Sequence, residues 1–119
     1  ILIGGPIVNK VTGEVNENLP VKFDSKNNWA IVSALSRQIY PSDEIGIVVK
    51  NRSPFNSEKS ILVVAGKRHT GTRAAIIAFL RHFKEVTAGN LYKKSVHAKV
   101  GEGIDLDSDG MIDEVEIRE

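Results

Sequence analysis

A dense series of acidic side chains near the end of this 119-residue sequence has the clearest chemistry. Residues 105–116 read DLDSDGMIDEVE, with Asp at alternate positions followed by Gly110 and further acids. This spacing matches the calcium template D-x-D-x-D-G with an acid at the twelfth position. In that template alternate carboxylates converge on one cation, and glycine lets the backbone turn. The predicted Ca²⁺ ligands are Asp105, Asp107, Asp109, the backbone carbonyl of Met111, Asp113 and Glu116.

The segments on both sides of this acidic loop alternate in hydrophobicity as strands do. Residues 96–100 precede it and residues 115–117 follow it, so a β-hairpin is predicted to carry the loop, in place of a helix–loop–helix hand. In a hairpin Asp113 becomes the natural fifth ligand, directly or through water. Glu116 then lies on the strand and faces solvent or the rim of the site. Ile112 is expected to tuck under the loop as an apolar anchor.

The charge of the chain is divided between its two parts. Residues 102–119 hold eight acidic residues and one basic residue, a formal charge of −7, whereas residues 1–101 hold fifteen basic and seven acidic residues, or +8. Acids packed this closely repel one another, and a bound divalent cation is the simplest compensation. The basic residues are scattered, and no recognised nucleic-acid-binding motif accompanies them. We therefore expect no nucleic-acid partner.

Buried strands and helices must position the acidic loop. Residues 45–50 (IGIVVK) and 61–65 (ILVVA) are short β-branched runs, typical of strands buried on both faces. The ten residues between them have no helical signal and are too few for a parallel crossover, which favours antiparallel pairing. The predicted fold is α/β, with a mixed, partly parallel sheet and a C-terminal hairpin carrying the calcium loop. At least two helices are expected, at about Pro6–Asn18 and Thr72–Val86.

The second predicted helix has two distinct sides. Large apolar residues form a stripe at helical spacing, and alanines keep one side narrow. Thr70 or Thr72 is expected to cap its start, and Ala88-Gly89-Asn90 suits a left-handed turn at its end. The stripe consists of Ile76, Phe79, Leu80 and Phe83, and the alanines are Ala74, Ala75 and Ala78.

The length and composition fit one domain over residues 1–119. Apolar residues make up 41% and charged residues 26%, as is usual for a globular protein. The absence of cysteine excludes disulfides, thiolate metal sites and a cysteine nucleophile. No apolar run approaches the roughly 18–20 residues that a membrane span needs. The sequence opens on ILIGGP without a Met, which indicates a piece of a longer protein.

One further segment has the character of a ligand loop. The glycine-containing turn Gly66–Thr72 leads from a strand into a helix N-terminus, as phosphate-binding loops do. It lacks the G-x-x-x-x-G-K-[ST] order, so an ordinary turn is favoured, and phosphate or sugar binding through Lys67, Arg68, Thr70 and Thr72 is the alternative.

Catalysis finds little support in the sequence. The three histidines have no metal-ligand spacing, and the serines lack the G-x-S-x-G context of a nucleophile elbow. The acids of the tail are explained better by one cation than by paired acid–base chemistry. No catalytic residue is predicted.

Three blocks in order resemble the C-terminal region of archaeal S-layer and S-layer-like cell-surface proteins. They are ILIGGP at the start, ILVVAGKRHTGTRAA at residues 61–75, and the acidic block DLDSDGMID at residues 105–113. The resemblance implies a secreted, surface-exposed module with a structural and non-catalytic role. Its expected partners are other domains of the same surface protein and further copies of itself. The alternative is a ligand-binding or accessory domain of an exported enzyme that uses the Gly66–Thr72 loop.

Overall fold

A computed structural model describes residues 1–6, 9–56 and 58–119. Within these residues the chain forms a five-stranded sheet and a three-stranded sheet. The strands of the large sheet are β1 (Leu2–Ile3), β5 (Ile45–Arg52), β6 (Ser60–Gly66), β7 (Ala98–Ile104) and β8 (Glu114–Ile117). Those of the small sheet are β2 (Val21–Asp24), β3 (Ala30–Ser33) and β4 (Ile39–Tyr40). The helices are α1 (Lys10–Val15), α2 (His69–Arg81) and α3 (Phe83–Thr87), with single 3₁₀ turns at Asn16–Asn18 and Ser25–Asn27.

The large sheet is mixed, as the sequence predicts. Its order is β1-β6-β5-β7-β8; β1 runs parallel to β6, and the other neighbours are antiparallel. β5 and β6 pair antiparallel over seven residue pairs, from Gly46 opposite Gly66 to Arg52 opposite Ser60. The expectation that residues 45–50 and 61–65 are antiparallel neighbours is therefore confirmed.

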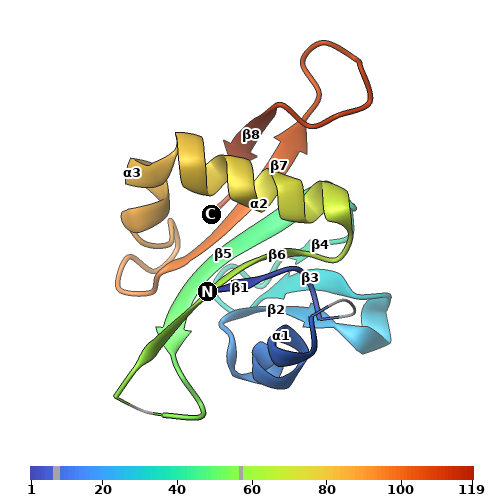
Figure 1. Cartoon of the computed structure of the whole chain (residues 1–119). Coiled ribbons are helices and arrows are strands. Elements are labelled where there is room, and N and C mark those ends of the chain that lie inside the picture. Colours follow the sequence, from blue (N-terminus) through green and yellow to red (C-terminus); the bar gives the residue numbers. More distant parts are fainter. Residues whose placement is uncertain (7–8, 57) are drawn as a thin grey trace.

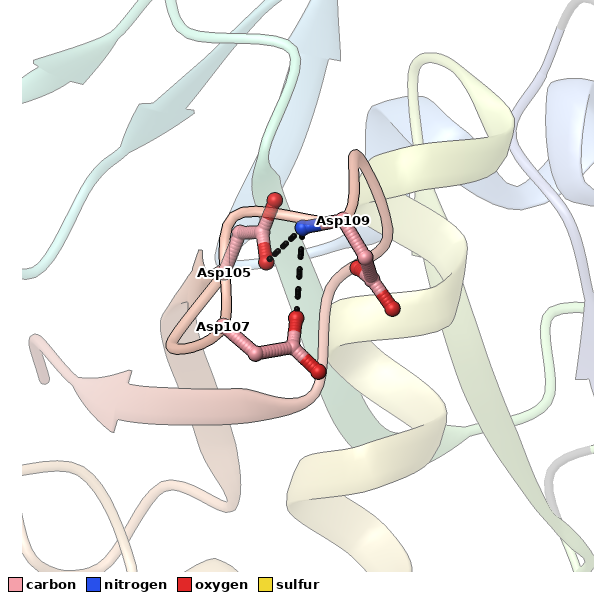
Figure 2. A group of neighbouring side chains, drawn as sticks. All are labelled: Asp105, Asp107 and Asp109. Carbon is pink, nitrogen blue, oxygen red and sulfur yellow. Dashed lines mark hydrogen bonds between the residues drawn. The ribbon is translucent and has the colours of Figure 1, made fainter.

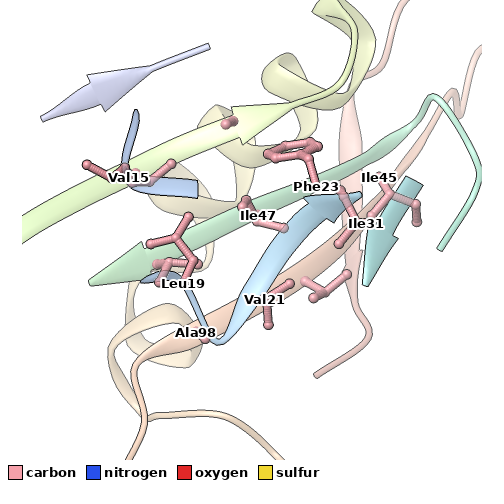
Figure 3. Close-up of a cluster of buried hydrophobic side chains, with 12 residues drawn as sticks. Val15, Leu19, Val21, Phe23, Ile31, Ile45, Ile47 and Ala98 are labelled. Atoms are coloured by element: carbon pink, nitrogen blue, oxygen red, sulfur yellow. The ribbon is translucent and has the colours of Figure 1, made fainter. Parts of the chain in front are cut away.

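Both faces of the large sheet are covered, which explains the nearly continuous apolar runs of β5 and β6. One face packs against the small sheet and α1, where side chains such as Phe23 and Ile31 meet Ile47 of β5 (Figure 3). The opposite face packs against α2 and α3, where Val48 and Val64 meet the alanines of α2. Figure 1 shows α2 and α3 on one side of the large sheet, and the small sheet with α1 on the other. Alternate residues of one strand therefore belong to two separate cores.

The first predicted helix, Pro6–Asn18, is shorter than expected. α1 begins at Lys10, and Asn9 caps it by accepting hydrogen bonds from the amides of Val11 (3.0 Å) and Thr12 (3.1 Å). A 3₁₀ turn continues it to Asn18. An Asn in the extended conformation is a strong start signal, and it overrides the weaker signal of Pro6. The two residues after Pro6, also assigned to this helix, lie outside the described residues.

The second predicted helix, Thr72–Val86, is two helices. α2 begins earlier, at His69, and ends where His82 leaves helical geometry, with φ −118° and ψ 37°. α3 then runs to Thr87, and Gly89 takes the left-handed φ of +86° that the sequence suggests.

The expected side-chain cap of this helix is absent among the described residues, because both threonines bond elsewhere. Arg68 occupies the N-cap position without a side-chain hydrogen bond. The Thr72 hydroxyl accepts from the Gly66 amide (3.0 Å), and the Thr70 hydroxyl donates to the carbonyl of Asp43 (3.0 Å).

The narrow side of α2 is the side that faces the sheet. A Cβ on Gly46 would lie 2.2 Å from the carbonyl oxygen of Gly71, so glycine in strand and helix allows the two backbones to touch. The alanines of α2 are buried beside this contact, whereas Ile76, Leu80 and Phe83 of the large apolar stripe are exposed. Ile77 is buried and Phe79 partly buried in the same core, so the sheet-facing side of α2 combines small residues with these two larger ones.

A buried carboxylate links the two sheets. Glu119 follows β8, is fully buried, and accepts hydrogen bonds from the hydroxyls of Ser33 (2.7 Å), Ser36 (2.5 Å) and Tyr40 (2.6 Å). It also accepts from the side-chain amide of Asn90 (3.1 Å), in the segment between α3 and β7. Ser33 and Tyr40 belong to the small sheet, so these bonds join it to the end of the large sheet.

Candidate metal centre

The acidic loop connects β7 to β8 at one end of the molecule. The two strands pair antiparallel, and the last pair before the loop is Ile104 opposite Glu114. The hairpin predicted to carry the loop is therefore confirmed. In Figure 1 the loop projects beyond the body of the sheet, near one end of α2.

Three aspartates of the loop converge on one point. Asp105, Asp107 and Asp109 each offer a carboxylate oxygen, and these oxygens all lie within 4.8 Å of one another. Figure 2 shows the three side chains around the turn. Asp107 and Asp109 are exposed and Asp105 is partly buried, so solvent and ions can reach the group. Alternate residues of a tight turn bring their side chains together, as the D-x-D-x-D-G spacing predicts.

Backbone amides already hold these carboxylates in place. Asp105 accepts from the amides of Asp109 (3.3 Å) and Gly110 (2.8 Å), and Asp107 accepts from Asp109 (3.2 Å). Asp109 accepts from Met111 (2.8 Å). Gly110 has φ +86°, the left-handed conformation that glycine adopts without strain. The loop is therefore held in shape by hydrogen bonds from its own amides to its own carboxylates.

The loop is anchored from below. Ile112 is 6% exposed and lies against Gly103 of β7, where a Cβ would be 2.8 Å from its Cγ2 atom. Two arginines of α2 hold the loop from the side: Arg73 Nε donates to the carbonyl of Ile112 (2.6 Å) and Arg81 Nη1 to that of Asp113 (2.5 Å). The apolar anchor was predicted. The arginines were not, although their spacing of eight residues places them on one helix face.

The environment affects the aspartates unequally. Burial acts to raise the pKa of Asp105, but hydrogen bonds from the Gly110 amide and from Asp107 outweigh it and lower the pKa overall. For Asp107, local desolvation and the neighbouring carboxylates of Asp105 and Asp109 raise the pKa, whereas the hydrogen bond from the Asp109 amide acts to lower it. Crowded acids raise one another's proton affinity, and a divalent cation removes that penalty.

The other predicted ligands are Met111, Asp113 and Glu116, and each makes contacts of its own. Asp113 closes the loop, where its carboxylate accepts from the amide of Leu106 (2.9 Å). The backbone N–H of Met111 donates to the Asp109 carboxylate, and the Met111 side chain is 52% exposed. Glu116 lies on β8 and pairs with Arg118 (3.1 Å), which also pairs with Glu102. The structure gathers the first three aspartates, and the roles of Met111, Asp113 and Glu116 stay predictions.

The residues present fit a hard cation such as Ca²⁺. Calcium takes six to eight oxygen ligands in flexible geometry, and carboxylate oxygens that accept one amide retain a lone pair for a metal. Three carboxylates that converge on one point supply hard oxygen ligands of this kind.

Two basic residues of the turn Gly66–Thr72 form ion pairs with one aspartate. Lys67 pairs with Asp43 at 3.2 Å and Arg68 pairs with the other oxygen of Asp43 at 3.3 Å. Thr72 is engaged by the Gly66 amide. The charges that a phosphate would need are therefore largely compensated within the chain.

The mixed sheet, the glycine-packed helix and the acidic hairpin describe a mixed α/β fold, and comparison with known proteins gives its family. A family model described as "S-layer like family, outer domain" matches residues 1–83. The chain belongs to this S-layer-like family. An uncharacterised protein of the archaeon Methanocaldococcus jannaschii is 34% identical over 85 residues, which cover 71% of this chain and 17% of that protein. The chain thus spans about a sixth of the length of this relative. No solved structure matches the chain.

None of the helices in the described residues is long and apolar enough to cross a membrane.

Proposed function

We propose that this chain is a non-catalytic structural module of a secreted cell-surface protein, stabilised by Ca²⁺ in its hairpin loop. The observation that carries the metal site is the convergence of Asp105, Asp107 and Asp109 within 4.8 Å. The family match supports the surface location and the structural role.

Calcium acts here by holding the turn together. A bound Ca²⁺ would neutralise carboxylates that otherwise repel one another, and Asp113 would be a further oxygen ligand from the same loop. Ile112, Arg73 and Arg81 connect the turn to the sheet and to α2, so order in the loop is transmitted to the body of the module. The residues that hold the ion have no catalytic role in this proposal.

The proposed partners are other domains of the same surface protein and further copies of this chain. A module with a fixed hairpin offers a rigid surface for such contacts. Sedimentation velocity with calcium and with chelator tests self-association, and a monomer in both buffers would leave the other domains as the partners.

Thermal unfolding with and without calcium tests the metal site. A ligand that binds only the folded state stabilises it by about 2.7 kcal/mol when its concentration is 100 times its Kd. We expect a higher Tm in calcium than in chelator, and we expect Asp107→Asn to abolish most of that difference. The control is Glu14→Gln, an exposed acid on α1 that should leave the calcium effect unchanged. Equal melting of the unsubstituted chain in calcium and in chelator would refute the proposal.

A further inference from the structure

A groove of about 770 Å³ lies between α2, the turn that precedes α2, and the far side of the acidic loop. Its lining combines apolar side chains, including Ile76, Leu80 and Met111, with basic ones. Arg73 and Arg81 come from α2, and Lys67 and Arg68 from the turn before it. Residues 110–113 form its wall opposite the helix. The three converging aspartates are not among its lining residues.

The apolar part of the groove is open to solvent. Leu80 is 72% exposed, Met111 52% and Ile76 36%. Ile76 and Leu80 are four residues apart and therefore lie on one side of the helix. They are exposed because they lie on the side of α2 away from the sheet, which the helix contacts through Gly71, its alanines and Ile77. Exposed apolar side chains gathered in a groove are typical of a binding surface.

The charged part of the groove has an excess of positive charge. Arg73 and Arg81 each donate to a backbone carbonyl, and within residues 1–6, 9–56 and 58–119 neither forms an ion pair. A guanidinium has five N–H donors, so each retains donors beyond that bond. Asp113 is the one carboxylate among the lining residues that the structure describes. Lys67 and Arg68, the other cations of the lining, already pair with Asp43. Arg73 and Arg81 therefore border the apolar strip without an ion pair among the described residues.

We propose that this groove binds a polypeptide segment of another protein in which apolar side chains alternate with carboxylates. The apolar side chains would contact Leu80, Ile76 and Met111. The carboxylates would receive charge-assisted hydrogen bonds from Arg73 and Arg81, whose planar donors match a carboxylate well. Asp105, Asp107 and Asp109 lie outside the groove, whereas Met111 and Asp113, two further predicted ligands, line it. Peptide binding is therefore measured both with and without calcium.

The test is titration of the 119-residue chain with a capped peptide of sequence Asp-Leu-Asp-Phe-Asp, followed by two-dimensional NMR. It is run in calcium and in chelator, and binding in either buffer counts. We expect amide shifts concentrated at residues 66–81 and 110–113, and weaker binding as salt is raised. A peptide with Lys in place of each Asp should leave these amides unmoved.

Variants separate the groove from the rest of the surface. Leu80→Ser and Arg81→Gln should each weaken peptide binding by roughly tenfold, because each removes one of the two kinds of contact. Leu80 is largely exposed, so its replacement should spare the fold even if Arg81→Gln loosens the loop. Leu91→Ser, a 63% exposed leucine outside the groove, is the matched control.

Three outcomes would overturn the inference. They are the absence of shifts with the acidic peptide in both buffers, equal binding of the acidic and basic peptides, and unchanged affinity in Leu80→Ser. Shifts at these amides with alginate, an acidic polysaccharide, but not with the peptide would assign the groove to another class of ligand.

Discussion

Glu119 shows how a single side chain can join two sheets. Its carboxylate is fully buried and surrounded by neutral donors from the small sheet and from Asn90. Burial acts to raise its pKa, but the hydrogen bonds from Ser36, Tyr40, Ser33 and Asn90 outweigh burial and lower it. Burial and the bond to Glu119 raise the pKa of Tyr40, so the phenol stays protonated and continues to donate. The ionised form of Glu119 is therefore the form that stabilises the fold.

Replacing Glu119 with Gln should destabilise the chain and change its response to acid. A carboxylate whose folded pKa is lowered stabilises fully above its unfolded pKa, about 4.3 for Glu, and loses this contribution as pH falls through the folded pKa. We expect Glu119→Gln to cost about 1–3 kcal/mol at neutral pH, because the amide satisfies the donors poorly. The difference from the unsubstituted chain should shrink below about pH 4.

Urea unfolding at a series of pH values measures this effect. The matched control is Glu58→Gln, an exposed acid after β5 that should change stability by less than about 0.5 kcal/mol. A stability difference for Glu119→Gln that is independent of pH would show that its charge is not what stabilises the fold.

The two acidic features differ in how far the sequence reveals them. The convergence of Asp105, Asp107 and Asp109 could be predicted because they are close in sequence, and a turn of fixed spacing brings them together with no help from the rest of the fold. Glu119 could not, since its partners lie between 29 and 86 residues away and are ordinary Ser, Tyr and Asn side chains. Nothing in the residues themselves marks that cluster before the sheets are assembled.

At the scale of elements, the packing of α2 is set by glycine. A Cβ on Gly71 would lie 2.3 Å from the carbonyl oxygen of Ile45, which belongs to the backbone and cannot turn away. This close approach places the alanines and Ile77 of the helix on the sheet, and Ile76 and Leu80 in solvent. The sequence predicted the helix from its periodicity. Which side is buried depends on this contact between Gly46 and Gly71, which periodicity does not encode.

Gly71→Ala should therefore destabilise the chain although alanine favours helices. The added methyl group must displace α2 from β5, and overpacking of this kind costs about 1–3 kcal/mol or more. Chemical unfolding monitored by circular dichroism measures it. Gly13→Ala in α1 is the comparison, because its Cβ would be 3.3 Å from the nearest atom, the Pro6 carbonyl oxygen, and the helix gains up to about 1 kcal/mol of propensity. Similar stabilities for the two variants would contradict the role of Gly71.

At the scale of the whole molecule, the large sheet extends beyond the part that defines the family. The family match ends at residue 83, yet β7 pairs with β5 over five residue pairs and supplies Ala98 and Val100 to the core. Burial on both faces of β5 and β6 was predictable from their apolar runs. The order β1-β6-β5-β7-β8 was not, because strand neighbours far apart in sequence are chosen by packing.

A chain that ends at residue 87 should fail to fold cooperatively. It would lose β7, β8 and Glu119, leave one edge of β5 unpaired, and uncover apolar side chains on both faces of the sheet. Thermal melting by circular dichroism compares it with residues 1–119. A sharp transition in the shortened chain would show that residues 1–87 are a complete folding unit.

Met111 holds the only sulfur atom of the chain, since the sequence has one Met and no Cys. Its side chain belongs to the acidic loop that carries the aspartates, and it is half exposed on the wall of the groove. Mild peroxide can therefore convert one thioether to a sulfoxide and leave the rest of the chain without a sulfur to oxidise. The rate of that gain of one oxygen, followed by mass spectrometry, is a label-free report of whether this wall is open or covered in any larger assembly.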